Sequence, residues 1–321
     1  MLCEAAPANA NFSVSPDCDS NIGIKTLLID HAILTRFNLP SPDYEERLRN
    51  RPRWLEERFK LFERYCLPCV AQQSSTNFKW IIYFDPASPA WAREIIRNYE
   101  RQGLFYPRFR AEVPRNDLLS DIRQLFPVRS SSLLTTNLDN DDMITKDFVH
   151  RLQAYAVDDT DRRVGLNFPR GYTYAEGRFY RHVDKSNAFA SMLEPWNGAI
   201  TIWCDWHTRL ARHAILTQVD KLPAWAQVIH GRNVSNRVRG WLVDPAIPLT
   251  VLAVPAAEVQ CVNFFERALD FGKYLLLRSP REAGRFILKS LFLVLLPKEG
   301  LHRVRLLMAR VTSTALADSD K

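Results

Sequence analysis

The sequence predicts an α/β protein built on a mostly parallel sheet with helices on both faces. Apolar, strand-like runs alternate with segments of helical periodicity along the first half of the chain. Such alternation is typical of parallel strands joined by helices. The strand-like runs are apolar enough to be buried, and 46% of the 321 residues are hydrophobic. A chain of this length and composition can therefore bury a sizeable core.

The predicted elements follow one another in a regular order. Strands are expected at 26–37, 79–85, 108–113 and 131–138, and helices at 54–73, 88–103, 117–126 and 145–158. Beyond residue 160 the pattern changes. In residues 164–183 an aromatic alternation is broken by Gly171 and Gly177, which predicts a hairpin, and 199–207 and 225–236 are expected to be strands. From residue 256 the periodicity is helical, with helices expected near 258–277, 280–295 and 299–312.

This order predicts one large domain between two extensions. Residues 1–20 are aperiodic and contain Asn, Ser and Pro, so we expect a loose leader there. Residues 21–255 form the predicted α/β domain, and residues 256–321 form a helical C-terminal extension. Eleven Lys and Arg against six Asp and Glu lie between Val262 and Lys321, so most of the net charge of +7 belongs to this extension. No nucleic-acid-binding motif accompanies the charge, and we expect no nucleic-acid partner.

The sequence predicts a cytoplasmic protein. Its first residues lack the basic and apolar regions of a secretory signal. The longest apolar run, 286–296, is eleven residues long and contains Lys289, whereas a membrane-spanning helix needs about 20 residues. Cys66 and Cys69 form a single CxxC inside a predicted helix, and we expect them to be buried, inert thiols.

An acidic cluster follows the strand expected at 131–138. In LTTNLDNDDMI, Asp139, Asp141 and Asp142 come directly after the apolar run. In parallel α/β sheets, ligands bind beyond the carboxyl ends of the strands. Three carboxylates this close repel one another, so water, a bound cation or a shared proton must offset the repulsion. Asp85 ends the strand at 79–85 in the same way.

The residues alone leave several interpretations of this acidic cluster open. It fits a solvated turn with an aspartate that caps the next helix. A calcium-binding EF-hand is excluded, because Ile144 and His150 stand where that loop needs Gly and Glu. A phosphatase or hydrolase would use Asp139 and Asp141 as nucleophile and acid. A divalent-metal site for a nucleotide diphosphate would use them as oxygen ligands. A non-catalytic glycan-binding protein would merely keep the fold.

A resemblance favours the metal site. Six segments in order resemble the bacterial rhamnosyl transferase family, which is similar to the GT-A glycosyltransferases. They are HAILTRFNL, RFKLFERYCLP, FKWIIYFD, LTTNLDNDDMI, NAFASMLE with His207, and WAQVIHGRNVSN. Together they cover roughly residues 30–240, and the set is specific although no single segment is. The chain departs from the family pattern at Asn137, where an Arg is expected.

The resemblance implies a GT-A-like fold and a metal-dependent transfer of a sugar, with rhamnose as one candidate, from a nucleotide-diphosphate donor. The implied acceptor is a glycan or a lipid-linked saccharide, and the implied metal is Mn²⁺ or Mg²⁺. The residues that it assigns to the metal are Asp141, Asp142 and His230, with His207 as the alternative histidine.

The resemblance also implies residues for the donor and for catalysis. Those assigned to the donor are Thr35, Arg36, Asp85, Asp139, Arg232 and Asn233. Glu194 is the expected catalytic base, with Asp184 as the alternative. The basic, apolar C-terminal helices suit an anionic membrane surface, and peripheral association at the inner face of a membrane is the corresponding expectation. A simpler interpretation is that these helices close the core and that their charged faces are solvated.

Overall fold

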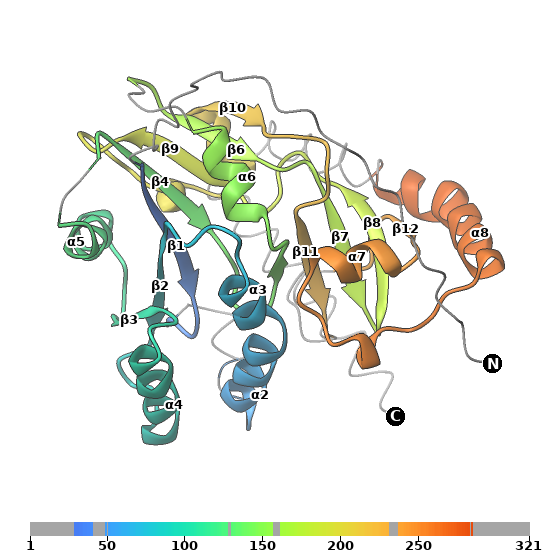
Figure 1. The fold of residues 1–321 in the computed structure, drawn as a ribbon, viewed down its shortest axis with the longest axis horizontal. Helices are drawn as coiled ribbons and strands as arrows, with labels where there is room; N and C mark the ends of the chain where they lie inside the picture. The colour runs from blue at the N-terminus through green and yellow to red at the C-terminus, as the bar shows by residue number, and fades with distance from the viewer. Residues whose placement is uncertain are drawn as a thin grey trace, which may run out of the picture.

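The computed structural model describes residues 29–40, 49, 51–127, 130–156, 161–230, 237–282 and 284. The predicted leader and the helices expected at 280–295 and 299–312 lie outside these residues or almost entirely so. Within the described part, two β-sheets stand next to each other (Figure 1). Helices cover the larger sheet on both faces.

The larger sheet has seven strands in the order β10-β6-β9-β4-β1-β2-β3. Their bounds are β1 Ile29–Arg36, β2 Lys79–Phe84, β3 Tyr106–Phe109, β4 Ser132–Asn137, β6 Val164–Asn167, β9 Ser191–Pro195 and β10 Ile215–Gln218. Strands β3, β2, β1 and β4 run parallel, and β9 runs antiparallel to both β4 and β6. The prediction of a mostly parallel α/β sheet flanked by helices is confirmed.

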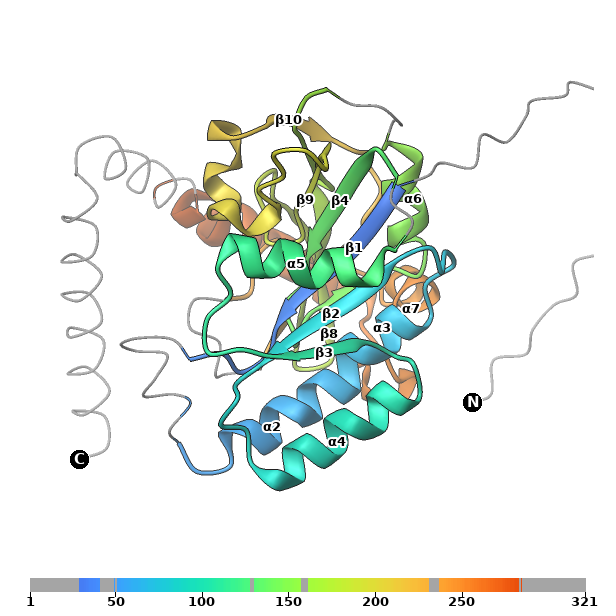
Figure 2. The same ribbon diagram turned by 90° about the vertical axis from the view of Figure 1, so that its left-hand side faces the viewer.

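Two helical layers bury the central strands. One layer contains α2 Trp54–Leu61, which continues through a π-helical turn into α3 Leu67–Ala71, together with α4 Ala90–Arg101 and α6 Phe148–Ala154. Helix α5, Arg115–Leu125, lies on the other face (Figure 2). Side chains alternate along the strands accordingly: Ile33 faces the first layer and Leu34 faces α5. Cys66 and Cys69 are buried free thiols in the first layer, and burial raises the pKa of Cys69 to about 11.

The smaller sheet has five strands in the order β12-β8-β7-β11-β5. Their bounds are β5 Met143–Ile144, β7 Arg170–Ala175, β8 Arg178–Val183, β11 Trp225–Ile229 and β12 Trp241–Leu242. The predicted hairpin is formed by β7 and β8, which turn at Glu176 and Gly177. Because β5 follows β4 after only a few residues, the chain crosses from one sheet to the other through the acidic cluster.

The segment after β12 contains helices separated by irregular stretches. It contains α7 Ala246–Val251, α8 Phe264–Lys273 and a π-helical turn at Tyr274–Arg278. Helix α8 lies at the outer edge of the smaller sheet (Figure 1), where Asp270 Oδ2 accepts a hydrogen bond of 2.7 Å from the backbone N–H of Leu242. None of the helices in the described ranges has both the length and the apolarity needed to span a bilayer.

The strand predicted at 199–207 is wrong. Residues Ile202–Cys204 and His207–Arg212 form short 3₁₀ turns, and the strand of this region is β9. The reason is local, because the backbone N–H groups of Ile200 and Thr201 donate to the carboxylate of Glu194. Thr201 also has a φ of 63°, which a strand does not tolerate. These amides are therefore unavailable to a sheet.

The close approach of β7 to β11 makes Gly171 sensitive to substitution. A Cβ at Gly171 would overlap the indole of Trp225, which is almost fully buried. We predict that Gly171→Ala lowers the free energy of unfolding by about 1–3 kcal/mol, as overpacking does. In α8 a Cβ at Gly272 would meet no atom, so Gly272→Ala is the matched control. It is expected to leave stability unchanged or to raise it by about 0.5–1 kcal/mol. Urea unfolding of both variants tests this, and equal midpoints would contradict it.

Candidate functional site

The acidic cluster occupies a turn that is held between the two sheets. Thr35 Oγ1, at the end of β1, donates to the carbonyl oxygen of Leu138 at 2.8 Å. Asn140 Nδ2 donates to the carbonyl oxygens of Arg36 and Phe37 at 3.1 and 2.8 Å. These bonds fasten the turn to the carboxyl end of β1, so the carboxylates project from a rigid base.

Asp141 lies at the centre of the site, between two basic side chains. Its Oδ2 atom accepts from Arg58 Nη1 at 2.7 Å and lies 2.9 Å from His230 Nε2. Arg58 belongs to α2, and His230 directly follows β11. Burial by itself would raise the pKa of Asp141, but the hydrogen bond with His230 and the charge of Arg58 outweigh burial and hold this pKa below its usual value. Asp141 is therefore ionised at neutral pH.

The other two carboxylates resist ionisation. Asp142 is almost fully buried, and its Oδ1 accepts from the backbone N–H of Val228 in β11 at 2.8 Å. Burial and repulsion from Asp141 raise the pKa of Asp142 well above its usual value. Loss of hydration among the crowded protein atoms and repulsion from Asp141 raise the pKa of Asp139 to about 6, although part of its side chain reaches solvent. The site thus resists the full ionisation of its three carboxylates.

The oxygen and nitrogen atoms that this site offers as ligands partly fit a divalent cation. Carboxylate oxygen and imidazole nitrogen are both suitable ligands, and two ligands on one octahedral ion lie about 3 Å apart, as Asp141 Oδ2 and His230 Nε2 do. Among the described residues no third His, Cys, Asp or Glu completes a three-ligand set. Mg²⁺ and Mn²⁺ commonly take one or two protein ligands and obtain the rest from phosphates and water. Asp142 Oδ1 instead accepts a hydrogen bond from β11. This contact favours a role for Asp142 in holding the turn over a role in binding the ion.

The residues expected at the donor lie along the carboxyl ends of β1 and β2, with varied environments. Arg36 stacks its guanidinium over the Trp203 ring at 4.3 Å, and its charge also acts on Asp139. Asp85 pairs with Arg49 at 2.5 Å and accepts from the backbone N–H of Ala87. Thr35 is fully buried, donates to Leu138 and accepts from Trp80 Nε1, so its position favours a structural role. Arg232 and Asn233 lie outside the described residues.

The expectation that Glu194 is the catalytic base conflicts with its position. Glu194 pairs with Leu133 near the start of β4, six residues before Asp139, which corresponds to about 20 Å along a strand. Its side chain is fully buried and accepts hydrogen bonds from Ile200, Thr201 and Arg163. Burial raises the pKa of Glu194 against these bonds. Its role is to fix the segment that follows β9.

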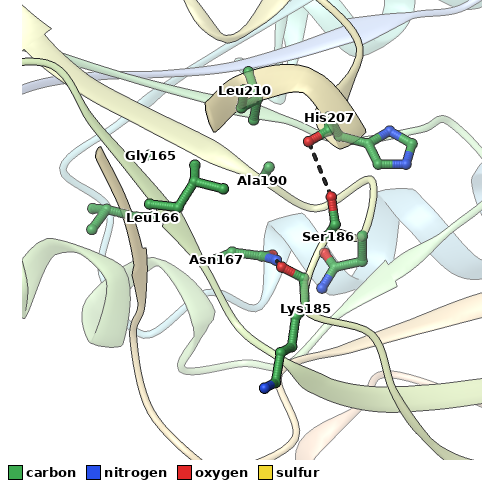
Figure 3. Close-up of a pocket in the computed structure, with 10 residues that line it drawn as sticks. Gly165, Leu166, Asn167, Lys185, Ser186, Ala190, His207 and Leu210 are labelled. Carbon is green, nitrogen blue, oxygen red and sulfur yellow. Dashed lines mark hydrogen bonds between the residues drawn. The ribbon is translucent and has the colours of Figure 1, made fainter. Parts of the chain in front are cut away.

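The alternative residues also lie elsewhere. Asp184 accepts from Ser186 N at 2.9 Å and pairs with Arg239 at 3.4 Å. His207 borders a recess beside β6 (Figure 3), where its carbonyl oxygen accepts from Ser186 Oγ at 3.2 Å and its ring points away from the other labelled side chains. The recess has a volume of only about 10 Å³, enough for one water molecule. His230, not His207, is the histidine that meets Asp141.

A larger hollow lies on the α5 side of the sheet and has a volume of about 350 Å³. The residues that line it come from the start of α5 and from the segment after β9: Val113, Arg115, Leu118, Ile200, Thr201, Trp203, Cys204 and His213. Trp203 connects the hollow to the acidic cluster, because its Nε1 donates to Asn137 Oδ1 at 2.8 Å. Asn137 Nδ2 in turn lies 3.4 Å from Asp139 Oδ1.

Sequence reasoning missed Arg58, Asn140 and Trp203. Arg58 begins the segment RFKLFERYCLP, but its sequence distance of 83 residues from Asp141 gives no sign of the ion pair. Asn140 is the uncharged residue inside the acidic cluster, and its side chain fastens the turn. The position of Asn140 between two carboxylates in the sequence is the signal that could have identified it as part of the site.

The fold is of the α/β class, in which ligands commonly bind at the carboxyl ends of parallel strands, and here that edge of the sheet carries a carboxylate cluster. The family model described as "Putative rhamnosyl transferase" matches residues 30–241, about two thirds of the sequence. The chain belongs to this family, which is a family of glycosyltransferases. No curated protein matches the chain.

The solved structures that match this chain share little sequence with it. TarS of S. aureus has 10% identity and a TM-score of 0.33 over 62% of this chain and 37% of its own, so this chain spans just over a third of TarS. A "putative nucleotide-diphospho-sugar transferase" of Desulfovibrio desulfuricans G20 has 10% identity and a TM-score of 0.30, over 62% and 81% of the two chains. The inositol-1-phosphate CTP transferase of T. maritima has 9% identity and a TM-score of 0.30, over 65% and 93%.

The raised pKa values of Asp139 and Asp142 predict a pH-dependent stability. The folded protein holds protons that the unfolded chain releases above the usual pKa of about 3.8, so stability falls as the pH rises from about 4 through 6. Asp142→Asn removes one of the repelling charges. It should melt higher than the wild type at pH 8 in a chelator, by roughly 2–4 °C for each kcal/mol of repulsion relieved.

The measurement is thermal unfolding at pH 5 and pH 8. Asp244→Asn is the control, because Asp244 is exposed and distant in sequence from the cluster, and Asn keeps its bond to the backbone N–H of Ala246. The wild type and this control should lose the same stability between the two pH values. An equal loss in Asp142→Asn would contradict the prediction.

Proposed function

We propose that the protein is a metal-dependent glycosyltransferase that moves a sugar, with rhamnose as the first candidate, from a nucleotide-diphosphate donor to a glycan or lipid-linked acceptor. The observation that carries this proposal is the convergence of Asp141 Oδ2 and His230 Nε2, 2.9 Å apart, at the carboxyl end of β4. Membership of a glycosyltransferase family supports the reaction class.

In this proposal Asp141 and His230 hold Mn²⁺ or Mg²⁺, and the donor diphosphate fills the remaining positions. The bound ion, as a Lewis acid, would neutralise charge on the leaving diphosphate. Arg58 lies 2.7 Å from Asp141 and would place a second positive charge beside the phosphates. The cation would also offset the repulsion between Asp139 and Asp141, and so would lower the pKa of Asp139 from its value of about 6.

The hydrolase interpretation of the same carboxylates has less support. In that interpretation Asp139 and Asp141 are nucleophile and acid, but Asp141 is ionised beside Arg58 and His230 and has no proton to give. Arg58 and His230 instead surround Asp141 with groups suited to phosphate. The arrangement therefore favours binding a diphosphate over attack on a phosphoryl group.

Calorimetric titration of dTDP, UDP and GDP, with Mn²⁺ and with chelator, tests the proposal. We expect one nucleotide to bind the wild type with Mn²⁺ and to bind at least tenfold more weakly with chelator. Asp141→Asn should lose the metal-dependent part of the affinity, since it removes a charged ligand. Asp244→Asn should bind like the wild type.

Two outcomes would count against the proposal in different ways. Equal nucleotide affinity with Mn²⁺ and with chelator would contradict the metal dependence and leave Arg58 and His230 as the phosphate-binding groups. A failure of all three nucleotides to bind under either condition would contradict the nucleotide-sugar donor itself.

We further propose that α8 and the turn after it place the protein on an anionic membrane surface. Their large apolar side chains are exposed to water: Phe264, Phe265, Leu269, Phe271, Leu275, Leu276 and Leu277. Such a patch is larger than scattered surface residues require. The region from Val262 onward, with eleven Lys and Arg against six Asp and Glu, also carries +5 of the net charge of +7. Apolar insertion together with basic charge is the pattern of interfacial helices, and a lipid-linked acceptor would lie at that surface.

Vesicle co-sedimentation tests this docking surface. The full chain should bind phosphatidylglycerol-containing vesicles more tightly than phosphatidylcholine vesicles. Leu276→Glu should weaken binding several-fold, because Leu276 is 79% exposed. Ile215→Glu is the matched control, since Ile215 is 57% exposed on β10 and outside the patch. If both substitutions have the same effect, the patch is not the docking surface.

A further inference from the structure

The larger hollow beside the acidic cluster contains a histidine–aspartate pair. His213 Nε2 lies 3.1 Å from Asp205 Oδ2. Asp205 Oδ1 accepts a hydrogen bond of 2.8 Å from the backbone N–H of Trp206, which fixes the carboxylate. Burial by itself would raise the pKa of Asp205, but this backbone bond and the contact with His213 hold it below its usual value. Asp205 is therefore a permanent anion that orients the imidazole.

The orientation leaves the second ring nitrogen for a ligand. Within the described ranges, Nδ1 of His213 makes no hydrogen bond, and His213 lines the hollow. A histidine oriented by a carboxylate through one nitrogen can accept a proton at the other. The other charged and titratable groups around the pair are Arg115, Cys204 and Arg209. Burial raises the pKa of Cys204 to about 11, so its thiol is neutral.

The hollow has the size and lining of a saccharide site. Its volume of about 350 Å³ lies within the usual range for small-molecule pockets, roughly 300–1,000 Å³. Val113, Ile200 and Trp203 give it apolar walls, whereas His213 and Arg115 supply polar groups. Sugars present both C–H faces and hydroxyl groups, and this lining matches both.

The hollow also lies close to the proposed donor site. Trp203, which lines the hollow, donates a hydrogen bond to Asn137, and Asn137 in turn contacts Asp139. Arg36 covers the Trp203 ring at 4.3 Å and fixes this wall. Glu194, which is not at the acidic cluster, shapes the far wall by holding Ile200 and Thr201.

We propose that this hollow is the acceptor subsite and that His213, oriented by Asp205, is the general base of the transfer, an inference that rests on the proposed function. His213 Nδ1 takes the proton of an acceptor hydroxyl. The acceptor oxygen forms a bond to the anomeric carbon while the bond from that carbon to the diphosphate breaks. The nucleotide diphosphate leaves with the bonding electron pair, the proton stays on His213, and the anomeric configuration inverts.

The first test is binding, which needs no activity. The probes are methyl glycosides of rhamnose, glucose, galactose and mannose, followed by saturation-transfer NMR on the full chain with saturating nucleotide and Mn²⁺. We expect at least one glycoside to bind the wild type. Val113→Trp fills the hollow and should weaken this binding at least tenfold while nucleotide affinity stays unchanged. If no glycoside binds, or if Val113→Trp binds them equally well, the subsite is overturned.

The second test is chemistry. His213→Gln keeps a hydrogen-bond donor toward Asp205 but cannot take a proton, so we expect an unchanged melting temperature and glycoside binding with a 10²–10⁴-fold loss of kcat. The rising limb of the wild-type rate with pH should also disappear. His150→Gln, on the exposed face of α6, should behave like the wild type. A loss of kcat of less than threefold in His213→Gln would overturn the assignment of His213 as the general base. Failure of nucleotide titration alone would instead overturn the donor site.

Discussion

The fastening of one turn between two sheets is the constraint on which the rest of the site depends. Residues 138–142 leave β4, bond to the end of β1 through Leu138 and Asn140, and reach β11 through Asp142. These bonds place Asp141 between a helix of one layer and a strand of the other sheet. Because Arg58 and His230 come from those two elements, the site exists only when the sheets are assembled.

The same turn explains why three carboxylates occur together. Asp141 is ionised and compensated by Arg58 and His230, whereas loss of hydration and repulsion from Asp141 raise the pKa of Asp142 well above its usual value and the pKa of Asp139 to about 6. Without a further cation, the rigid turn holds the three carboxylates close together against their mutual repulsion. A divalent ion with a diphosphate would relieve it, and the energy relieved would appear as affinity for the donor. In the proposed function the cluster would therefore couple stability to ligand binding, which a solvated turn would not do.

The sequence predicts the fold better than it predicts the roles of individual residues in the site. Apolar runs and helical spacing locate β1, β2, β4 and the helices between them, because buried strands and amphipathic helices leave direct periodic signals. The run at 199–207 misleads, since a buried carboxylate from β9 takes the amides that a strand would use. Asp141 is singled out by its position after a strand and His230 by the family resemblance, and the structure brings these two side chains together. Arg58, Trp203 and the true environment of Glu194 depend on contacts between distant segments, and periodicity does not show them.

The central claim is that Asp141 and His230 hold a divalent cation together with a diphosphate. Pulsed EPR of Mn²⁺ with the tightest-binding nucleotide tests it most directly, because the Mn²⁺ spin couples to a ligating imidazole nitrogen and to phosphate phosphorus. The wild type should show both couplings, and His230→Gln should lose the nitrogen coupling but keep the phosphorus coupling. A wild-type spectrum without nitrogen coupling, or Mn²⁺ that binds equally to Asp141→Asn, would contradict the account.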